Sequence, residues 1–367
     1  MDHSTYSEAD FPLSPLMFYY EVTTACDLVC KHCRASAQEE PSPDQLTLEQ
    51  GKTLLSQIAT FPRRPTVVLT GGDPLKRPDL LELVRHGISL GIPLALTPSA
   101  TPLATREVLE KIRDAGIERL GISLDGSDAA THDGFRGWGG SFRLTLEMLS
   151  AARNLGMKVQ VNTTVCQRNV SLLDQIAQLL AECKIAMWAV FFLVPVGRGT
   201  LEPRISPEQY EEVFEKLFHY SRTMPYAVKT TEAPHYRRYV LQRGGNPLAG
   251  PGGATDGLHR GHRAPLGVTD GKGVMFVSNT GEILPAGFLP LTCGRFPQES
   301  IVDVYQKHPT FLALRKPNEF KGKCGVCEFR NVCGGSRSRA FALTGDPLES
   351  EPDCVYEPKA MRVAQAL

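Results

Sequence analysis

The chain has 367 residues, with 40 lysines and arginines against 40 aspartates and glutamates, so its formal net charge is zero. This balance argues against a sequence-blind nucleic-acid binder, which needs a basic excess. No apolar run approaches the roughly 20 residues that cross a bilayer, and the N-terminus lacks an apolar signal segment. We therefore expect a cytoplasmic protein that binds neither nucleic acid nor membrane and keeps its ten cysteines reduced.

Six short apolar segments alternate with amphipathic segments from residue 17 onward. The apolar segments lack a polar face, as strands of a buried parallel sheet do. We predict strands at 17–23, 66–70, 93–97, 119–124, 158–165 and 187–194, and helices at 47–60, 78–90, 105–115, 141–155, 171–182 and 206–224. Six β–α units predict an α/β fold, a partial (β/α)6 TIM-like barrel that stays open because eight units close a barrel. Ligands of such folds bind at the carboxyl ends of the strands.

The chain outside these units has a different composition. Residues 244–265 are rich in glycine and proline and show no periodicity, which is typical of a linker or mobile loop. Segments 274–278 and 282–284 flank Asn-Thr-Gly and predict a β-hairpin. The predicted regions are an N-terminal tail (1–16), the barrel (17–224), a linker with the Gly/Pro-rich loop (225–265) and a small cysteine-rich C-terminal region (266–367).

A first cysteine cluster follows the first predicted strand directly. Cys26, Cys30 and Cys33 have the spacing C-x3-C-x2-C. Structural zinc sites usually have four ligands arranged in two pairs, so this spacing fits zinc poorly. Three thiolates suit an iron–sulfur cubane that keeps one iron open. The alternative is a chance group of buried thiols.

This spacing at the end of the first strand resembles the radical S-adenosylmethionine (radical SAM) superfamily. His32 stands where the superfamily usually has an aromatic residue before the last cysteine. The segment Gly71-Gly72-Asp73-Pro74 follows the second strand in the register of the superfamily's Gly-Gly-Glu-Pro, with Asp for Glu. The resemblance implies that the three cysteines bind a 4Fe-4S cluster and that S-adenosylmethionine (SAM) occupies its open iron, with Gly71, Gly72, Asp73 and Pro74 near its amino group.

Polar residues near other predicted strand ends stand where the superfamily contacts SAM. The residues that the resemblance implies as cofactor contacts are Ser99, Ser123, Asp125, Arg136, Asn162 and Arg198. For each of them a structural role is an equal alternative: serines cap helices, Asp-Gly is a common turn, and arginines on loops form surface ion pairs.

A second cysteine cluster, Cys324-x2-Cys327-x5-Cys333-x20-Cys354, supplies four thiolates. Four thiolates close either a zinc site or a 4Fe-4S cluster. The spacing resembles the SPASM/twitch extension of radical SAM enzymes, which houses auxiliary clusters. That extension usually has a further cysteine after its hairpin, where this chain has Ala286. The resemblance therefore implies one auxiliary 4Fe-4S cluster. Cys166 and Cys183 are predicted to be buried structural thiols, and Cys293 is predicted to be a free thiol.

The C-terminal segments Gly287–Pro290, Lys323–Arg330 and Cys333–Arg337 resemble the haem-biosynthesis branch of the superfamily, which includes iron-coproporphyrin decarboxylases. The resemblance implies an oxidoreductase that cleaves SAM reductively to a 5′-deoxyadenosyl radical. That radical would remove a hydrogen from a tetrapyrrole propionate, which would lose CO2 and one electron. The resemblance also implies an electron donor such as flavodoxin or ferredoxin. Arginines 136, 198, 337 and 339 are candidate partners of the propionates, although the last two fit a role in supporting the cluster loop equally well.

Two other functions remain open at this point. Other SPASM enzymes crosslink or oxidise a ribosomally made precursor peptide, often through a leader-binding domain, for which the 16 residues before the first strand are too few. A non-catalytic iron–sulfur or zinc scaffold is the other alternative, and the complete first cysteine set argues against it.

Overall fold

A curved ten-stranded sheet organises the chain in the computed structural model, which describes residues 6–251 and 266–365. Its strand order is β10-β9-β8-β1-β2-β3-β4-β5-β6-β7, and neighbours from β8 through β1 to β7 run parallel. The strands are β1 (Met17–Thr23), β2 (Thr66–Gly71), β3 (Leu94–Leu96), β4 (Arg119–Ser123), β5 (Lys158–Val165), β6 (Met187–Phe192), β7 (Ala227–Thr231), β8 (Val274–Val277), β9 (Glu282–Leu284) and β10 (Gly294–Arg295). β7 and β10 are the two edges, so the barrel is open, as predicted.

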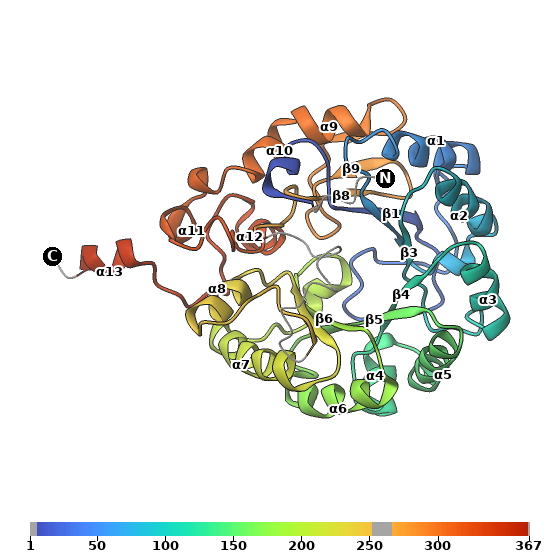
Figure 1. Cartoon of the computed structure of the whole chain (residues 1–367), viewed down its shortest axis with the longest axis horizontal. Coiled ribbons are helices and arrows are strands. Elements are labelled where there is room, and N and C mark those ends of the chain that lie inside the picture. Colours follow the sequence, from blue (N-terminus) through green and yellow to red (C-terminus); the bar gives the residue numbers. More distant parts are fainter. Residues whose placement is uncertain (1–5, 252–265, 366–367) are drawn as a thin grey trace.

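Helices surround the outer face of this sheet (Figure 1). Several start at a residue whose side chain accepts a backbone N–H of the first turn, among them Thr47, Thr105 and Ser206. The barrel helices are α1 (Leu48–Ile58), α2 (Leu80–Ser89), α3 (Arg106–Asp114), α4 (Ala129–Arg136), α5 (Ser141–Asn154), α6 (Leu173–Cys183), α7 (Pro207–Thr223) and α8 (His235–Gln242). The C-terminal helices are α9 (Ile301–Lys307), α10 (Pro309–Leu314), α11 (Gly322–Val326), α12 (Arg337–Thr344) and α13 (Lys359–Gln365).

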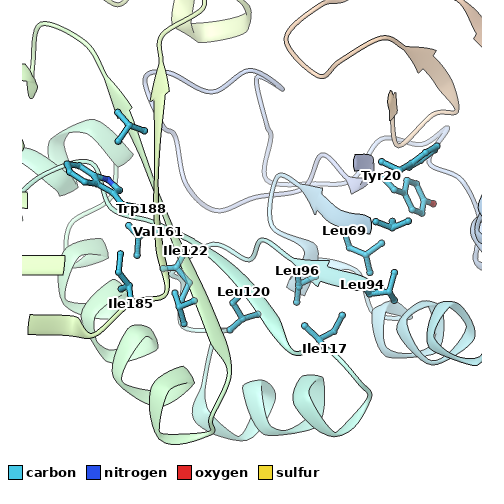
Figure 2. Packing of buried hydrophobic residues seen from close by; sticks show 14 of the residues in the cluster. Tyr20, Leu69, Leu94, Leu96, Ile117, Leu120, Ile122, Val161, Ile185 and Trp188 are labelled. Atoms are coloured by element: carbon cyan, nitrogen blue, oxygen red, sulfur yellow. The ribbon is translucent and has the colours of Figure 1, made fainter. Parts of the chain in front are cut away.

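One continuous hydrophobic core lies between the strands and these helices. Figure 2 shows Leu96, Ile122 and Trp188 within it, on successive parts of the sheet. All three side chains are fully buried. Because successive strand residues point to opposite faces, the residues between them point into the barrel. The outward-facing strand residues thus pack in the core against the helices. The inward-facing residues are available for a functional site.

The structure corrects two predictions of secondary structure and confirms a third. Residues 227–231 form strand β7 and residues 235–242 form helix α8, where a linker was predicted. Helix α4 occupies residues 129–136, where no helix was predicted. The predicted hairpin is present as β8 and β9, but β8 also pairs with β1, so the hairpin extends the barrel sheet.

Residues 252–265, most of the predicted Gly/Pro-rich loop, lie outside the described residues. Within the described residues, we find no helix that is long and apolar enough to span a membrane.

Candidate active site

The first cysteine loop leaves the carboxyl end of β1. Cys26 and Cys30 are buried and Cys33 is half-buried. They form a small apolar cluster with Leu28 and Ala37, against which Trp138 packs. The three sulfur donors therefore share one largely apolar environment at the mouth of the barrel. This is the position after the first strand that the sequence analysis predicted.

Backbone N–H groups of the same loop point at these sulfurs. Leu28 N donates to Cys26 Sγ at 3.4 Å, and Ala37 N donates to Cys33 Sγ at 3.5 Å. Burial raises the pKa of the Cys26 thiol to about 11, so a metal is needed to hold it as a thiolate at neutral pH. Hydrogen bonds to ligand sulfurs are one of the features that tune iron–sulfur clusters. The donor set and its surroundings fit a cluster.

Arg136 and Asp125 lie behind this loop as a buried ion pair. Arg136 Nη2 is 2.7 Å from Asp125 Oδ2, and Arg136 Nη1 donates to Cys30 Sγ at 3.5 Å. Thr164 N donates to Asp125 Oδ1 at 2.7 Å. Burial raises the pKa of Asp125, but the Arg136 guanidinium and two nearby histidines outweigh it, and the net shift is downward. Arg136 lies at the end of α4 rather than in a loop, and it links the Cys30 sulfur to β5.

His32 also belongs to this network. Its Nε2 is 3.9 Å from Asp125 Oδ2, and its ring stacks on Phe135 with centroids 4.3 Å apart. Burial lowers the pKa of His32 to about 4, so the ring is neutral at neutral pH. His32 therefore fills the position of the expected aromatic residue by stacking.

Arg198 holds the cysteine loop from the opposite side. Its Nε donates to Cys30 O at 2.8 Å and its Nη1 donates to Ala37 O at 2.9 Å. The neighbouring Gly197 approaches so closely that a Cβ there would lie 2.5 Å from Cys33 O. Nε and Nη1 of Arg198 therefore both bond carbonyls of the cysteine loop. The third nitrogen of this guanidinium, Nη2, is buried without a hydrogen-bond partner among the described residues.

Gly71 and Gly72 allow β2 to approach the start of the cysteine loop. A Cβ on Gly71 would lie 2.2 Å from Thr23 O, and one on Gly72 would lie 2.4 Å from Ala25 O. Asp73 N then donates to Ala25 O at 2.6 Å. These contacts show why no side chain fits at either glycine: the close approach is to the chain's own backbone.

Asp73 is fully buried and accepts three hydrogen bonds. The donors are Leu75 N at 3.1 Å, Ser99 N at 3.2 Å and Thr101 Oγ1 at 3.1 Å. Burial raises the pKa of Asp73 to about 6. Pro74 begins the short 3-10 helix Pro74–Lys76. The carboxylate thus joins the end of β2 to the loop after β3.

The other predicted contacts lie nearby. Ser99 Oγ is 3.6 Å from Cys26 Sγ. Ser123 and Asn162 are neighbours in the β4–β5 register. Gln160 Nε2 donates to Asn162 Oδ1 at 2.7 Å. The structure therefore gathers the predicted residues at one end of the barrel, although Asp125, Arg136 and Asp73 all have protein partners.

The second set of cysteines surrounds one small pocket at the C-terminal end of the chain. Cys324, Cys327, Cys333 and Cys354 all line it. Backbone N–H groups again point at the sulfurs: Glu351 N at 3.2 Å from Cys324, Phe329 N at 3.4 Å from Cys327, and Gly335 N at 3.4 Å from Cys333. Burial raises the pKa of Cys354 to about 11 and that of Cys333 further.

His235 is a member of this pocket that the sequence analysis missed. It begins α8 and is 1% exposed, and neither ring nitrogen has a hydrogen-bond partner among the described residues. Its ring stacks on Tyr210 at 5.3 Å between centroids. An unpartnered buried imidazole beside four thiols leaves hydrogen-bonding capacity for a group inside the pocket. No spacing in the sequence links this histidine to the cysteines.

Arg337 and Arg339 are fully buried beside the second set. Arg339 Nε is 2.8 Å from Glu351 Oε1 and 3.1 Å from Asp353 Oδ2. Arg337 Nη1 donates to Glu349 O at 2.6 Å, and its Nη2 donates to Cys324 Sγ at 3.7 Å. These contacts support the other role that the sequence analysis left open for the two arginines, which is to hold the cysteine loop.

Within residues 6–251 and 266–365, no three His, Cys, Asp or Glu side chains lie close enough together to hold a metal ion as they stand. Of the remaining thiols, Cys166 and Cys293 are buried and Cys183 is half-buried.

Residues 20–183 match the radical SAM superfamily. The AdoMet-dependent heme synthase of Methanosarcina barkeri is 37% identical over 345 residues, covering 94% of this chain and 97% of that protein. The protein of the same name from Oleidesulfovibrio alaskensis is 38% identical, covering 93% of this chain and 87% of that one. A PqqA peptide cyclase of Bradyrhizobium diazoefficiens is 28% identical, with 94% and 87% covered.

Solved structures share the fold. The crystal structure of Streptococcus suis SuiB bound to S-adenosylmethionine superposes with a TM-score of 0.70 at 16% identity, covering 94% of this chain and 78% of SuiB. The fold is that of the radical SAM superfamily, whose members bind S-adenosylmethionine and a 4Fe-4S cluster. The chain belongs to the radical SAM superfamily, in the branch of the AdoMet-dependent heme synthases.

Proposed function

We propose that this enzyme cleaves SAM reductively and removes a hydrogen atom from a propionate side chain of an iron tetrapyrrole, which then loses CO2. The observation that carries the proposal is the three-cysteine loop at the carboxyl end of β1, beside the inward-facing polar residues of β4 and β5. The likeness to heme synthases over nearly the whole chain supports the tetrapyrrole as substrate.

In this proposal Cys26, Cys30 and Cys33 bind the 4Fe-4S cluster. When bound, the cluster supplies one electron to SAM, and the resulting 5′-deoxyadenosyl radical takes the hydrogen atom. The chain's own residues orient the cysteine loop and shield its sulfurs from water. Arg136 places a positive charge against Cys30, and Arg198 fixes the backbone of the loop. Leu28, Ala37 and Trp138 exclude water around the sulfurs.

Ser123 and Asn162 are the proposed contacts of the SAM ribose and carboxylate, because they face the barrel interior side by side. Ser99 is a further proposed contact beside Cys26. Gly71, Gly72, Asp73 and Pro74 shape this edge of the site, and the Asp73 carboxylate acts by holding the loop after β3 in place. Asp125 acts by holding Arg136.

We propose that Cys324, Cys327, Cys333 and Cys354 bind one auxiliary 4Fe-4S cluster, with His235 as a hydrogen-bond donor to it. The four sulfurs line one pocket, and three of them accept backbone N–H groups. The cluster would accept the electron that remains when a propionate radical loses CO2 and becomes a vinyl group. A flavodoxin or ferredoxin would reduce the first cluster.

The test is anaerobic incubation of the purified enzyme with iron coproporphyrin, SAM and a reductant, followed by mass spectrometry. We expect a mass loss of one CO2 and two hydrogens for each propionate converted, with one 5′-deoxyadenosine formed for each. Iron and sulfide analysis should give about eight irons per chain for two cubanes. An unchanged porphyrin with continued SAM cleavage would refute the substrate, and about four irons with one zinc would refute the auxiliary cluster.

Maturation of a precursor peptide is the second candidate function. The observation in its favour is the 28% identity to a PqqA peptide cyclase over 94% of this chain. The identity to heme synthases is higher at the same coverage, which favours the tetrapyrrole. A short precursor peptide encoded beside this gene and modified by the enzyme would reverse that order.

A further inference from the structure

Lys229 lies on an inner row of the barrel that the sequence analysis did not identify. It is the middle residue of β7, and the β6–β7 register pairs it with Ala189. Ala189 in turn pairs with Asn162, and Asn162 pairs with Ser123. One lateral row thus crosses four adjacent parallel strands in the order Ser123, Asn162, Ala189, Lys229.

This row faces the barrel interior. The residues on either side of Ala189 in β6 are Trp188 and Val190, and both belong to the hydrophobic core under the helices. Side chains alternate along a strand, so Ala189 points inward. Laterally paired residues of parallel strands share a face, so Lys229 points inward as well.

The Lys229 ammonium has no carboxylate partner among the described residues. No hydrogen bond, ion pair or ring contact of Lys229 is found there, and the only effect on its pKa is desolvation by burial, which lowers it to about 8. The side chain is half-buried and is still mainly protonated at neutral pH. Partial burial of a cation without a counter-charge costs stability, and it leaves the charge available to a ligand.

The arginines near the two cysteine loops already have protein partners. Arg136 is paired with Asp125, Arg198 bonds two loop carbonyls, and Arg339 is paired with Glu351. Lys229 differs from them because its ammonium has no such partner and lies on the row that carries Ser123 and Asn162. Ala189, between Asn162 and Lys229, has a side chain of only one methyl group.

We propose that the Lys229 ammonium binds a carboxylate of the substrate inside the barrel. This inference rests on the proposed function, for which the carboxylate is a propionate of the tetrapyrrole. Lys229 and Asn162 are two strands apart, a separation of about 10 Å between backbones. A propionate held by Lys229 would therefore extend over Ala189 toward the proposed SAM site at Asn162 and Ser123. Lys229 would select substrates that carry a carboxylate and would position the carbon that loses hydrogen.

The test measures binding of iron coproporphyrin to the anaerobic holoenzyme by absorbance titration in the porphyrin band. Lys229→Met keeps the length of the side chain and removes its charge, and we expect its Kd to rise about tenfold or more. Lys229→Arg keeps the charge and should stay within a few-fold of wild type. Lys158→Met is the matched control, because Lys158 is exposed at the start of β5, and its Kd should be unchanged.

A second ligand separates charge recognition from packing. The propionamide analogue of iron coproporphyrin has no carboxylates, so wild type should bind it more weakly, whereas Lys229→Met should discriminate much less between acid and amide. Lys229→Met should unfold at a temperature no lower than wild type, since it removes an unpaired charge from a desolvated site.

The outcomes distinguish this inference from the proposed function. If wild type binds no iron coproporphyrin, the proposed substrate is wrong and the inference is overturned with it. If wild type binds it and Lys229→Met binds acid and amide as wild type does, only the role of Lys229 is wrong. Equal weakening of both ligands in Lys229→Met would also overturn it, because the lysine would then act through packing.

Discussion

The two cysteine loops differ in the number of thiols and in what surrounds them. The first has three cysteines within eight residues at the barrel mouth, beside the inward-facing row that carries Ser123 and Asn162. The second has four cysteines, drawn from a 31-residue stretch, that line one pocket. Three ligands leave a coordination position for a substrate, whereas four complete the set. This difference underlies our proposal of reaction at the first loop and electron transfer at the second.

The loops share one feature despite this difference. In each, an arginine side chain donates to a cysteine sulfur: Arg136 to Cys30 at 3.5 Å and Arg337 to Cys324 at 3.7 Å. A thiolate-bound cluster carries negative charge, and a buried guanidinium offsets part of the cost of burying it. The arginine beside each set of sulfurs supports the anionic cluster that we propose for each loop.

The largest expected effect is the loss of the first site. Cys30→Ala leaves two thiols in the first loop, so we expect no detectable 5′-deoxyadenosine and a fall from about eight to about four irons per chain. The measurements are anaerobic iron analysis and chromatography of the nucleoside. Cys183→Ala is the control, since this half-buried thiol lies in α6 outside both loops, and it should retain both properties. Retention of SAM cleavage by Cys30→Ala would remove the basis of the comparison.

Removal of one thiol from the second loop should separate SAM cleavage, proposed for the first loop, from electron acceptance, proposed for the second. Cys327→Ala should still form 5′-deoxyadenosine, because the first loop is intact, but it should form little or no decarboxylated tetrapyrrole. Quantifying both products in the same reaction checks this. Normal yield of the tetrapyrrole product would show that the electron leaves by another route.

The buried charges around the second loop should contribute more to stability than surface charges do. Arg339→Met leaves Glu351 without its arginine partner, whereas Asp353 keeps its ion pair with Arg204, and breaking a buried pair in this way costs about 3–5 kcal/mol. Lys307→Met removes an exposed i,i+4 pair with Asp303, for which about 0–1 kcal/mol is expected. Denaturant unfolding of the three proteins measures the difference. Equal effects would show that the second loop does not depend on this ion pair.

The smallest predicted effect depends on pH. Glu232 follows β7, and burial, followed by the charge of Asp270, raises the pKa of Glu232 well above its ordinary value of 4.5. The Ser336 hydroxyl donates a hydrogen bond to Glu232. This bond and the charge of Arg339 lower the pKa of Glu232, whereas the charge of Glu351 raises it. A raised carboxyl pKa favours the protonated folded state, so the contribution of Glu232 to stability is largest at low pH and falls as pH rises above about 4.5.

Glu232→Gln removes this ionisation and should therefore raise the unfolding temperature more at pH 8 than at pH 5. Thermal unfolding at the two pH values measures it, with Glu319→Gln as an exposed control. A gain that does not depend on pH would mean that Glu232 stays neutral throughout or is paired in the folded state.

Local patterns in the sequence predicted six strands and both cysteine sets. Apolar runs such as 158–165 and the spacing of Cys26, Cys30 and Cys33 depend only on neighbouring residues, so they can be recognised without a structure. The branch of the superfamily was recognisable for the same reason, since its motifs are contiguous, and the comparisons confirm it.

The tertiary structure decided what depends on contacts between distant segments. Strand β7 escaped prediction because Ala-Val-Lys-Thr-Thr lines an open edge of the barrel interior and has no apolar run. His235 is placed beside the second cysteine pocket by α8, almost 90 residues before Cys324. The inner row that ends in Lys229 exists only through the register of four strands. Register is set by backbone pairing and core packing over the whole sheet, and no local pattern in the chain specifies it.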